Sequence, residues 1–212
     1  MIKYDIPFYP NPDETHCVQA VFRMVLKYFT GKEYSWEELD RMSHKVKDKG
    51  TWLFPALIEF AKLGIEIENV ESFNYQKFYE EGEPYVRKYY RPVVANWYTK
   101  GSNLLDVKGF IPEYLKTVKN TIGSATIDDI EKYLTDGWLV ACDVNAGVLV
   151  GEKGYDSHLV LVVGFDQGNL YLNDPYLPEE SYKDRKVSKR LFQKAWSSAG
   201  EGTEGLTAFR KG

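Results

Sequence analysis

The chain has 212 residues, a formal net charge of −4 and 43% hydrophobic residues. These values fit one soluble globular unit with a substantial core, and they give no reason to expect nucleic acid or acidic phosphates as partners. The sequence has no uninterrupted apolar stretch of about 18 residues, and residues 1–5 do not resemble a secretion signal. We therefore expect no membrane partner and no export.

The first predicted element is a helix that starts near Cys17 and ends before Gly31. Its apolar residues recur at the i, i+3, i+4, i+7 spacing of an amphipathic helix, and only Gln19, Arg23 and Lys27 form a polar stripe. A helix with such a narrow polar face is expected to lie inside the domain.

The position of Cys17 at the start of this helix makes it a candidate nucleophile. Asp13 or Thr15 is the expected N-cap, so Cys17 falls in the first turn. Unpaired backbone N–H groups and the positive end of the helix dipole favour the thiolate there, and the thiolate is the nucleophilic form. The alternative is a small buried hydrophobic residue that happens to be cysteine, which is the commoner role of a free cysteine.

The rest of the first half is predicted to be mostly helical. Ser35 opens a capping box, residues 55–63 form a short helix with Gly64 behind it, and residues 65–70 alternate as a strand. Residues 73–98 are rich in aromatic side chains. These side chains either line a substrate cleft or pack in the core, and packing is the commoner role.

The second half predicts an antiparallel sheet. Three apolar runs, 138–144, 159–165 and 170–172, are separated by short loops, with a turn at 166–169. Parallel pairing would need crossover connections of about a dozen residues or more.

This hairpin is expected to bring two polar residues together. His158 lies at the entry to its first strand and Asp174 just after its second, at similar distances from the turn. A carboxylate beside an imidazole fixes its tautomer and supports its charged form, as in a set of nucleophile, base and orienting group. Taken alone, an isolated histidine on a strand is more often structural.

The ordered set of Cys17 with its apolar helix, the strand 157–166 and the segment 170–175 resembles the C39-like peptidases of the papain-like superfamily. Two further segments match, 126–137 and 188–196. His158 lies 141 positions after Cys17, within the roughly 130–150 expected for papain-type enzymes.

The resemblance implies an α+β, papain-like fold. A helical first lobe, about residues 1–120, would contribute the cysteine-bearing helix, and an antiparallel β-sheet lobe, about residues 121–212, would pack on it. The whole chain, residues 1–212, would form a single domain.

The resemblance also implies roles for four residues. Cys17 would be the nucleophile, His158 the general base and later acid, and Asp174 the group that orients the imidazole. The oxyanion-hole side chain is usually a glutamine six residues before the nucleophile, where this chain has Asn11. Asn11 carries the same amide on a shorter stem, and it could equally be a turn former between two prolines.

Two neighbours of the nucleophile depart from the family. The family tends to have Asp and Gly on either side of the cysteine, where this chain has His16 and Val18. We interpret His16 as a partly exposed first-turn residue. The departures leave the shape of the nucleophile turn, and activity itself, open.

The leading functional hypothesis is a cysteine peptidase or amidase that cleaves a peptide or small amide through an acyl-enzyme. An acyltransferase would use the same residues, an inactive papain-like fold would be a binding module, and an interaction protein could carry the cysteine incidentally. No cofactor and no metal is expected, because two cysteines and three histidines show no paired-ligand spacing. Pairing Cys17 with Cys142 would destroy the nucleophile, so a reducing cytoplasm is the expected setting.

Overall fold

The computed structural model describes residues 1–176, 182–200 and 202–212. Its strands are β1 (Ile2–Lys3), β2 (Ile65–Glu71), β3 (Lys119–Ile122), β4 (Leu139–Asn145), β5 (Ser157–Phe165), β6 (Asn169–Asp174), β7 (Tyr182–Ser188) and β8 (Leu206–Lys211). Its α-helices are α1 (Cys17–Thr30), α2 (Trp36–Ser43), α3 (Phe54–Lys62), α4 (Tyr75–Glu81), α5 (Glu83–Tyr89), α6 (Pro92–Lys100), α7 (Ile111–Thr117), α8 (Ile127–Thr135), α9 (Ala146–Val150) and α10 (Lys189–Trp196). Short 3₁₀ turns occupy residues 108–110 and 197–199.

One mixed sheet organises these elements into an α+β fold. The strand order is β3-β2-β8-β4-β5-β6-β7, and β1 pairs with β5. Within the described ranges every pairing of these strands is antiparallel except that of β2 with β3. The predicted antiparallel sheet of the second half is confirmed for β4, β5 and β6.

The sheet is larger than the sequence predicts, because it is not confined to residues after 120. The C-terminal strand β8 lies between β2 and β4, so a strand of the first half is hydrogen-bonded into the sheet. Such a long-range pairing leaves no local pattern in the sequence.

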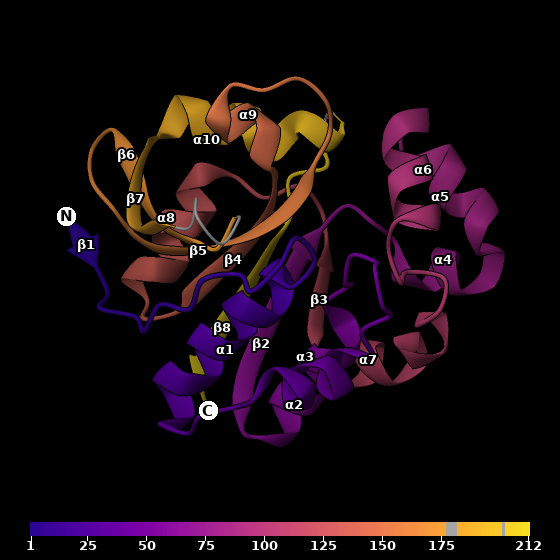
Figure 1. Ribbon diagram of the computed structural model, residues 1–212, viewed down its shortest axis with the longest axis horizontal. Helices are drawn as coiled ribbons and strands as arrows, with labels where there is room; N and C mark the ends of the chain where they lie inside the picture. Colours follow the sequence, from indigo (N-terminus) through magenta and orange to yellow (C-terminus); the bar gives the residue numbers. More distant parts are fainter. Residues whose placement is uncertain (177–181, 201) are drawn as a thin grey trace.

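The two faces of the sheet bury two separate apolar clusters. On β4, Leu139 and Ala141 join one cluster, while Val140, Cys142 and Val144 join the other. This division follows from the alternation of side chains along a strand. Helices α1 and α3 contribute to the first cluster and α8 and α10 to the second, so helices cover both faces (Figure 1).

Helix α1 has the predicted extent. Gly31 ends it with a φ of 71°, a left-handed conformation that glycine adopts without steric penalty. The predicted N-cap is wrong: His16 is the N-cap and provides no side-chain cap. The predicted polar stripe is also wrong at its start, because Gln19 is fully buried and its amide donates to Ser43 and Thr51.

Several other local predictions are confirmed. Ser35 forms the predicted capping box with Glu38. A capping box that was not predicted, between Thr126 and Asp129, starts α8. The aromatic segment 73–98 forms α4, α5 and α6, and its rings pack around Phe73.

In the described part of the chain, no helix has the length and apolar character needed to cross a bilayer.

Candidate active site

The structure brings Cys17, His158 and Asp174 together from three elements. Cys17 is the first residue of α1, His158 lies near the start of β5, and Asp174 ends β6. Cys17 and His158 line the same hollow and their side chains interact, and His158 Nε2 lies 2.7 Å from Asp174 Oδ1. Because Asp174 occupies Nε2, Nδ1 is the ring nitrogen that remains for the thiol.

These contacts favour the charged form of His158. Burial lowers the pKa of His158, but hydrogen bonds and charge interactions with Asp174 and Cys17 outweigh it and raise the pKa to about 10. His158 is 4% exposed. A buried imidazolium that touches a thiol is the partner a thiolate needs.

Asp174 is held by a second cation that sequence reasoning missed. Arg185 Nη1 on β7 lies 2.6 Å from Asp174 Oδ2, and Arg185 Nη2 donates to the carbonyl oxygen of Leu149. Burial raises the pKa of Asp174, but His158 and Arg185 together hold it below its usual range. Arg185 lies in a run of charged residues that looks like an exposed strand, so no spacing in the sequence identifies it.

The hairpin that carries His158 is fixed by Asp143 on β4. Asp143 Oδ1 accepts from the backbone N–H of His158 at 3.0 Å and from the Ser157 hydroxyl at 2.9 Å, and Oδ2 accepts from Tyr98 at 2.8 Å. Burial raises the pKa of Asp143, although these hydrogen bonds lower it. Asp143 is a second site-forming residue that the sequence did not reveal.

Asn11 joins the two sides of the site. Its Oδ1 accepts from the backbone N–H groups of Asp13 and His16, and its Nδ2 donates to the carbonyl oxygen of Tyr176 at 2.9 Å. Asn11 therefore shapes the turn before Cys17 and links it to the segment after Asp174. One N–H of the Asn11 amide donates to the Tyr176 carbonyl oxygen. That the second N–H donates to an oxyanion stays a prediction.

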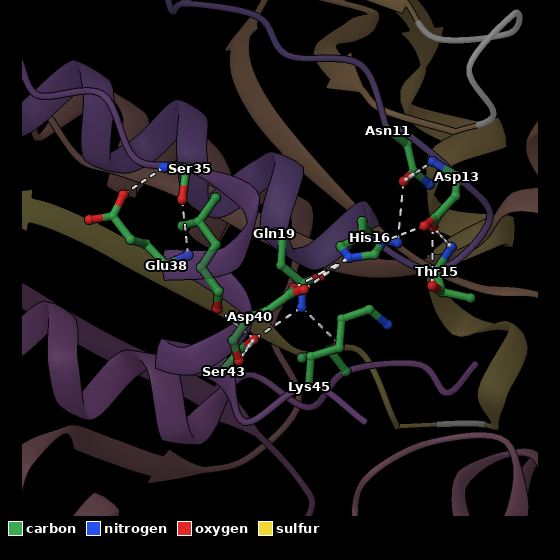
Figure 2. A network of polar contacts seen from close by, with 12 residues as sticks. Asn11, Asp13, Thr15, His16, Gln19, Ser35, Glu38, Asp40, Ser43 and Lys45 are labelled. Carbon is green, nitrogen blue, oxygen red and sulfur yellow. Dashed lines mark hydrogen bonds and ion pairs between the residues drawn. The ribbon is translucent and has the colours of Figure 1, made fainter. Parts of the chain in front are cut away.

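His16 is more constrained than predicted. Figure 2 shows its ring between two carboxylates: Nδ1 lies 2.7 Å from Asp13 Oδ2 and Nε2 lies 3.3 Å from Asp40 Oδ1. Lys45 lies nearby, and burial lowers its pKa against the opposing effect of Asp40 and Asp13. These charged groups lie beside the turn that carries Cys17.

Two hollows meet at Cys17. The smaller, about 300 Å³, is lined by Asn11, His158 and Tyr176 as well as by Cys17. The larger, about 320 Å³, runs from Cys17 and Val18 to residues of β2 and β8. The thiol is thus accessible from space large enough for a substrate.

The second cysteine does not compete with this arrangement. Cys142 is buried in the apolar cluster on one face of the sheet, while Cys17 packs against the cluster on the other. Both thiols are free, and burial raises the pKa of Cys142 far above its usual range. In the residues that the structure describes, no group of three or more His, Cys, Asp or Glu side chains is placed to hold a metal ion.

Comparisons with known proteins identify the family and the fold of the chain. The model of the Peptidase_C39 like family matches residues 3–204. A "Crystal structure of a double glycine motif protease from AMS/PCAT transporter in complex with the leader peptide" is 15% identical over 100% of this chain and 95% of that one, with a TM-score of 0.52. The peptidase domain of Streptococcus ComA, described as a bi-functional ABC transporter involved in a quorum sensing pathway, is 17% identical over 97% of this chain and 98% of that one, with a TM-score of 0.51. At these identities the two structures show the fold.

One curated relative matches over a short stretch. The "Uncharacterized protein YvpB" of Bacillus subtilis (strain 168) is 46% identical over 49 residues, 23% of this chain. The match spans 18% of the length of that relative.

Proposed function

Because the chain belongs to the Peptidase_C39 like family, we propose that it is a cysteine peptidase or amidase that hydrolyses its substrate through an acyl-enzyme on Cys17. One observation carries this proposal: His158 shares a hollow with Cys17 and interacts with its thiol, while its Nε2 lies 2.7 Å from the carboxylate of Asp174. Nucleophile, base and orienting group are thus connected in series within a papain-like arrangement.

In the proposed reaction, the Cys17 thiolate attacks the carbonyl carbon of the scissile bond. The imidazolium of His158 then protonates the leaving amine as the tetrahedral intermediate collapses to a thioester. Neutral His158 next takes a proton from water as the water attacks the thioester, and the acid leaves as the Cys17 thiolate reforms beside the imidazolium of His158. Asp174 keeps the ring oriented through Nε2 in both half-reactions.

The proposed oxyanion donors are the second N–H of the Asn11 amide and the backbone N–H of Cys17. Asn11 lines the same hollow as Cys17 and His158. The first backbone N–H groups of a helix have no intrahelical partner, and the N-cap His16 supplies no side-chain cap at the start of α1. Both donors would stabilise the negative oxygen of the tetrahedral intermediate.

A catalytically weak binding module is the second candidate. The observation that favours it is the hydrogen bond from the Asn11 amide to the carbonyl oxygen of Tyr176, which uses part of the donor capacity assigned to the oxyanion. The presence of Val18 in place of glycine favours it too. In this case substrate-like peptides would bind without turnover.

Thiol labelling and cleavage assays separate these candidates. Rapid labelling of Cys17 by iodoacetamide near neutral pH is expected, while buried Cys142 serves as the internal control. Peptide libraries, including peptides with a double-glycine motif like the one named for the structural neighbour, are then tested for cleavage. Cleavage that disappears in Cys17→Ala supports hydrolysis. Rapid labelling and binding without cleavage would favour the binding module, and product transfer to an added amine would favour an acyltransferase.

We also propose that residues 1–212 work as one domain in a reducing, cytoplasmic setting. The two apolar clusters share a single sheet, which supports the first point. The need to keep Cys17 reduced supports the second. Mass spectrometry of thiol states in cells tests the setting, and a two-state unfolding transition tests the single domain.

A further inference from the structure

The larger hollow beside Cys17 has a composition that the proposed reaction does not explain. Its volume is about 320 Å³, and it extends from the start of α1 past residues 48–53 to the helical segment 75–101 and to residues of β2, β4 and β8. Its walls are aromatic, formed by Trp52, Tyr75, Tyr90, Trp97, Tyr98 and Tyr155. Its size suits one long side chain or a group of similar volume.

The charges that line this hollow have a single sign. Three exposed acids lie around it, Glu14, Asp48 and Asp156, and two half-buried acids lie within it, Glu71 and Asp143. Within the described part of the chain, no Lys, Arg or His lines it. The exposed Arg91 lies 6.0 Å from the centroid of the Tyr155 ring and donates to the carbonyl oxygen of Ser198, so this cation lies close to the hollow without lining it.

The two inner carboxylates have only neutral hydrogen-bond partners in the described ranges. Glu71 accepts from the Asn69 amide and from the Tyr75 hydroxyl, and Asp143 accepts from Tyr98 and from the backbone and side-chain donors at the start of β5. No ion pair joins either of them to a described residue.

The charge of His158 acts on Asp143, but no described cation is among the groups that act on Glu71, so a negative charge on Glu71 is unfavourable there. Buried charges are normally paired, and burial raises the pKa of Glu71 to about 7, an effect to which the neighbouring charge of Asp143 adds. A cation that enters the hollow would relieve both effects, and the surrounding aromatic faces would attract it as well.

We propose that this hollow is the specificity pocket of the enzyme and that it takes the cationic side chain of a substrate lysine or arginine. This inference rests on the proposed function, because the hollow opens at Cys17 and a substrate held there would place its carbonyl group at the thiol. The apolar stem of the side chain lies between the aromatic walls, and the ammonium or guanidinium group lies at Glu71 and Asp143. The cation of a lysine or arginine side chain is carried away from the backbone on a long stem, whereas the α-amine of the residue that is cleaved stays beside its own carbonyl.

The test compares acetylated fluorogenic peptides that differ at one position. At each position near the scissile bond, peptides are made with lysine, arginine, norleucine or glutamate. Norleucine is the neutral residue whose stem resembles that of lysine. The wild type is expected to prefer lysine or arginine over norleucine by about 10-fold or more in kcat/KM at one position, as expected where buried polar groups are left unpaired by the wrong substrate. Glutamate is expected to be the poorest.

The matched variant is Glu71→Gln, which keeps the shape and hydrogen-bonding capacity of the side chain and removes its charge. It should lose most of the lysine preference, measured as the ratio of kcat/KM for the lysine peptide to kcat/KM for the norleucine peptide. Glu37→Gln changes an exposed glutamate of α2 outside the hollow and should retain the preference. Unchanged lysine preference in Glu71→Gln would overturn the assignment, as would cleavage of neutral peptides without any cationic preference.

A binding measurement keeps the inference testable if no peptide in the set is cleaved. The rate of Cys17 alkylation by iodoacetamide is measured with N-acetyl-lysine amide or N-acetyl-norleucine amide present. Lysine amide should protect the thiol at lower concentration in the wild type and lose this advantage in Glu71→Gln. Equal protection by both amides would refute the pocket even where Cys17 itself is reactive. Stronger protection by norleucine amide with a free α-amine would refute the assignment to a side chain.

Discussion

Arg185 donates to the carboxylate oxygen of Asp174 that His158 leaves free, with Nη1 2.6 Å from Oδ2. Asp174 is fully buried, so its negative charge is stable there only with both partners. The Arg185 side chain is 19% exposed and also donates to the Leu149 carbonyl. We therefore regard Arg185 as a positioning residue that keeps Asp174 ionised and oriented toward His158.

The variant Arg185→Met tests this role through stability. Loss of a hydrogen bond to a charged group is expected to lower the free energy of unfolding by about 1.5–3 kcal/mol near pH 7. The pKa of Asp174 is lowered in the folded protein, so the stabilisation is present at neutral pH and is lost as the pH falls through that pKa. Urea unfolding at pH 7 and at pH 3 should therefore show a difference between variant and wild type that shrinks in acid.

Arg185→Lys serves as the matched control, since it keeps the charge but not the two-pronged geometry. Its stability should lie between those of the wild type and Arg185→Met. Equal stability of all three proteins at pH 7 would show that Asp174 does not depend on Arg185.

The residues that the sequence could identify are those fixed by local patterns. Cys17 follows from the apolar periodicity of α1, and the approach of His158 to Asp174 follows from a hairpin whose turn is visible in the sequence. Even there the register is irregular between Val162 and Gly164, yet the two side chains still meet. Counting residues outward from the turn was enough to predict the contact, because His158 and Asp174 both lie at the open end of the same hairpin.

The residues that the sequence could not identify depend on pairing between distant segments. Arg185 reaches Asp174 only because β7 pairs with β6, with a further irregularity between Leu172 and Asp174. Glu71 lies in the hollow because β2 pairs with β8, which is inserted beside β4. Neither pairing has a sequence signal, since long-range register is set by the packing of the whole sheet.

Removal of the Asp174 charge should change the pH dependence of activity. His158 has its pKa raised to about 10, and the charge interactions with Asp174 are among the causes. In the proposed reaction the acid form of His158 protonates the leaving amine, so kcat/KM should fall only at strongly basic pH in the wild type. In Asp174→Asn this basic limb should move down by about 1–3 pH units, the usual effect of one adjacent opposite charge. A profile of kcat/KM from pH 6 to 11 that is identical in the two proteins would contradict the assignment.

The same raised pKa makes a prediction about stability. A histidine with a folded pKa above its unfolded value of about 6.5 stabilises the protein fully below that value, and this contribution is lost as the pH rises through about 10. The free energy of unfolding should therefore decline from pH 7 to pH 10 more steeply in the wild type than in His158→Ala. Urea unfolding of both proteins at pH 7 and pH 10 measures this. The change in the free energy of unfolding between the two pH values is compared between wild type and variant, so that groups titrating alike in both proteins cancel.

The donor role of Asn11 can be separated from its role in the turn. Asn11→Asp keeps an oxygen to accept from the backbone N–H groups of Asp13 and His16, but it loses the amide donor. Peptide turnover should fall by about 100-fold or more if the amide stabilises the oxyanion. Alkylation of Cys17 by iodoacetamide forms no oxyanion, so its rate should change far less. A parallel loss of both rates would assign Asn11 to the shape of the turn alone.

The proposed cation pocket should work better as the pH rises through neutrality. Burial raises the pKa of Glu71 to about 7, so this carboxyl group is mostly neutral at pH 6 and mostly ionised at pH 8. The titratable groups that interact with it are all acids, namely Tyr75, Tyr85, Tyr89, Tyr90, Tyr114 and Asp143.

The measured quantity is the ratio of kcat/KM for a lysine peptide to that for the matching norleucine peptide. Titration of Cys17 and His158 affects both substrates equally and cancels in this ratio, which leaves the charge of the pocket as the variable. The ratio is expected to increase by about tenfold from pH 6 to pH 8, following the ionised fraction of a group with a pKa near 7. In Glu71→Gln it should stay flat over the same range. A ratio in that variant that rises as steeply as in the wild type would assign the titration to another carboxyl group, with Asp143 the first to test.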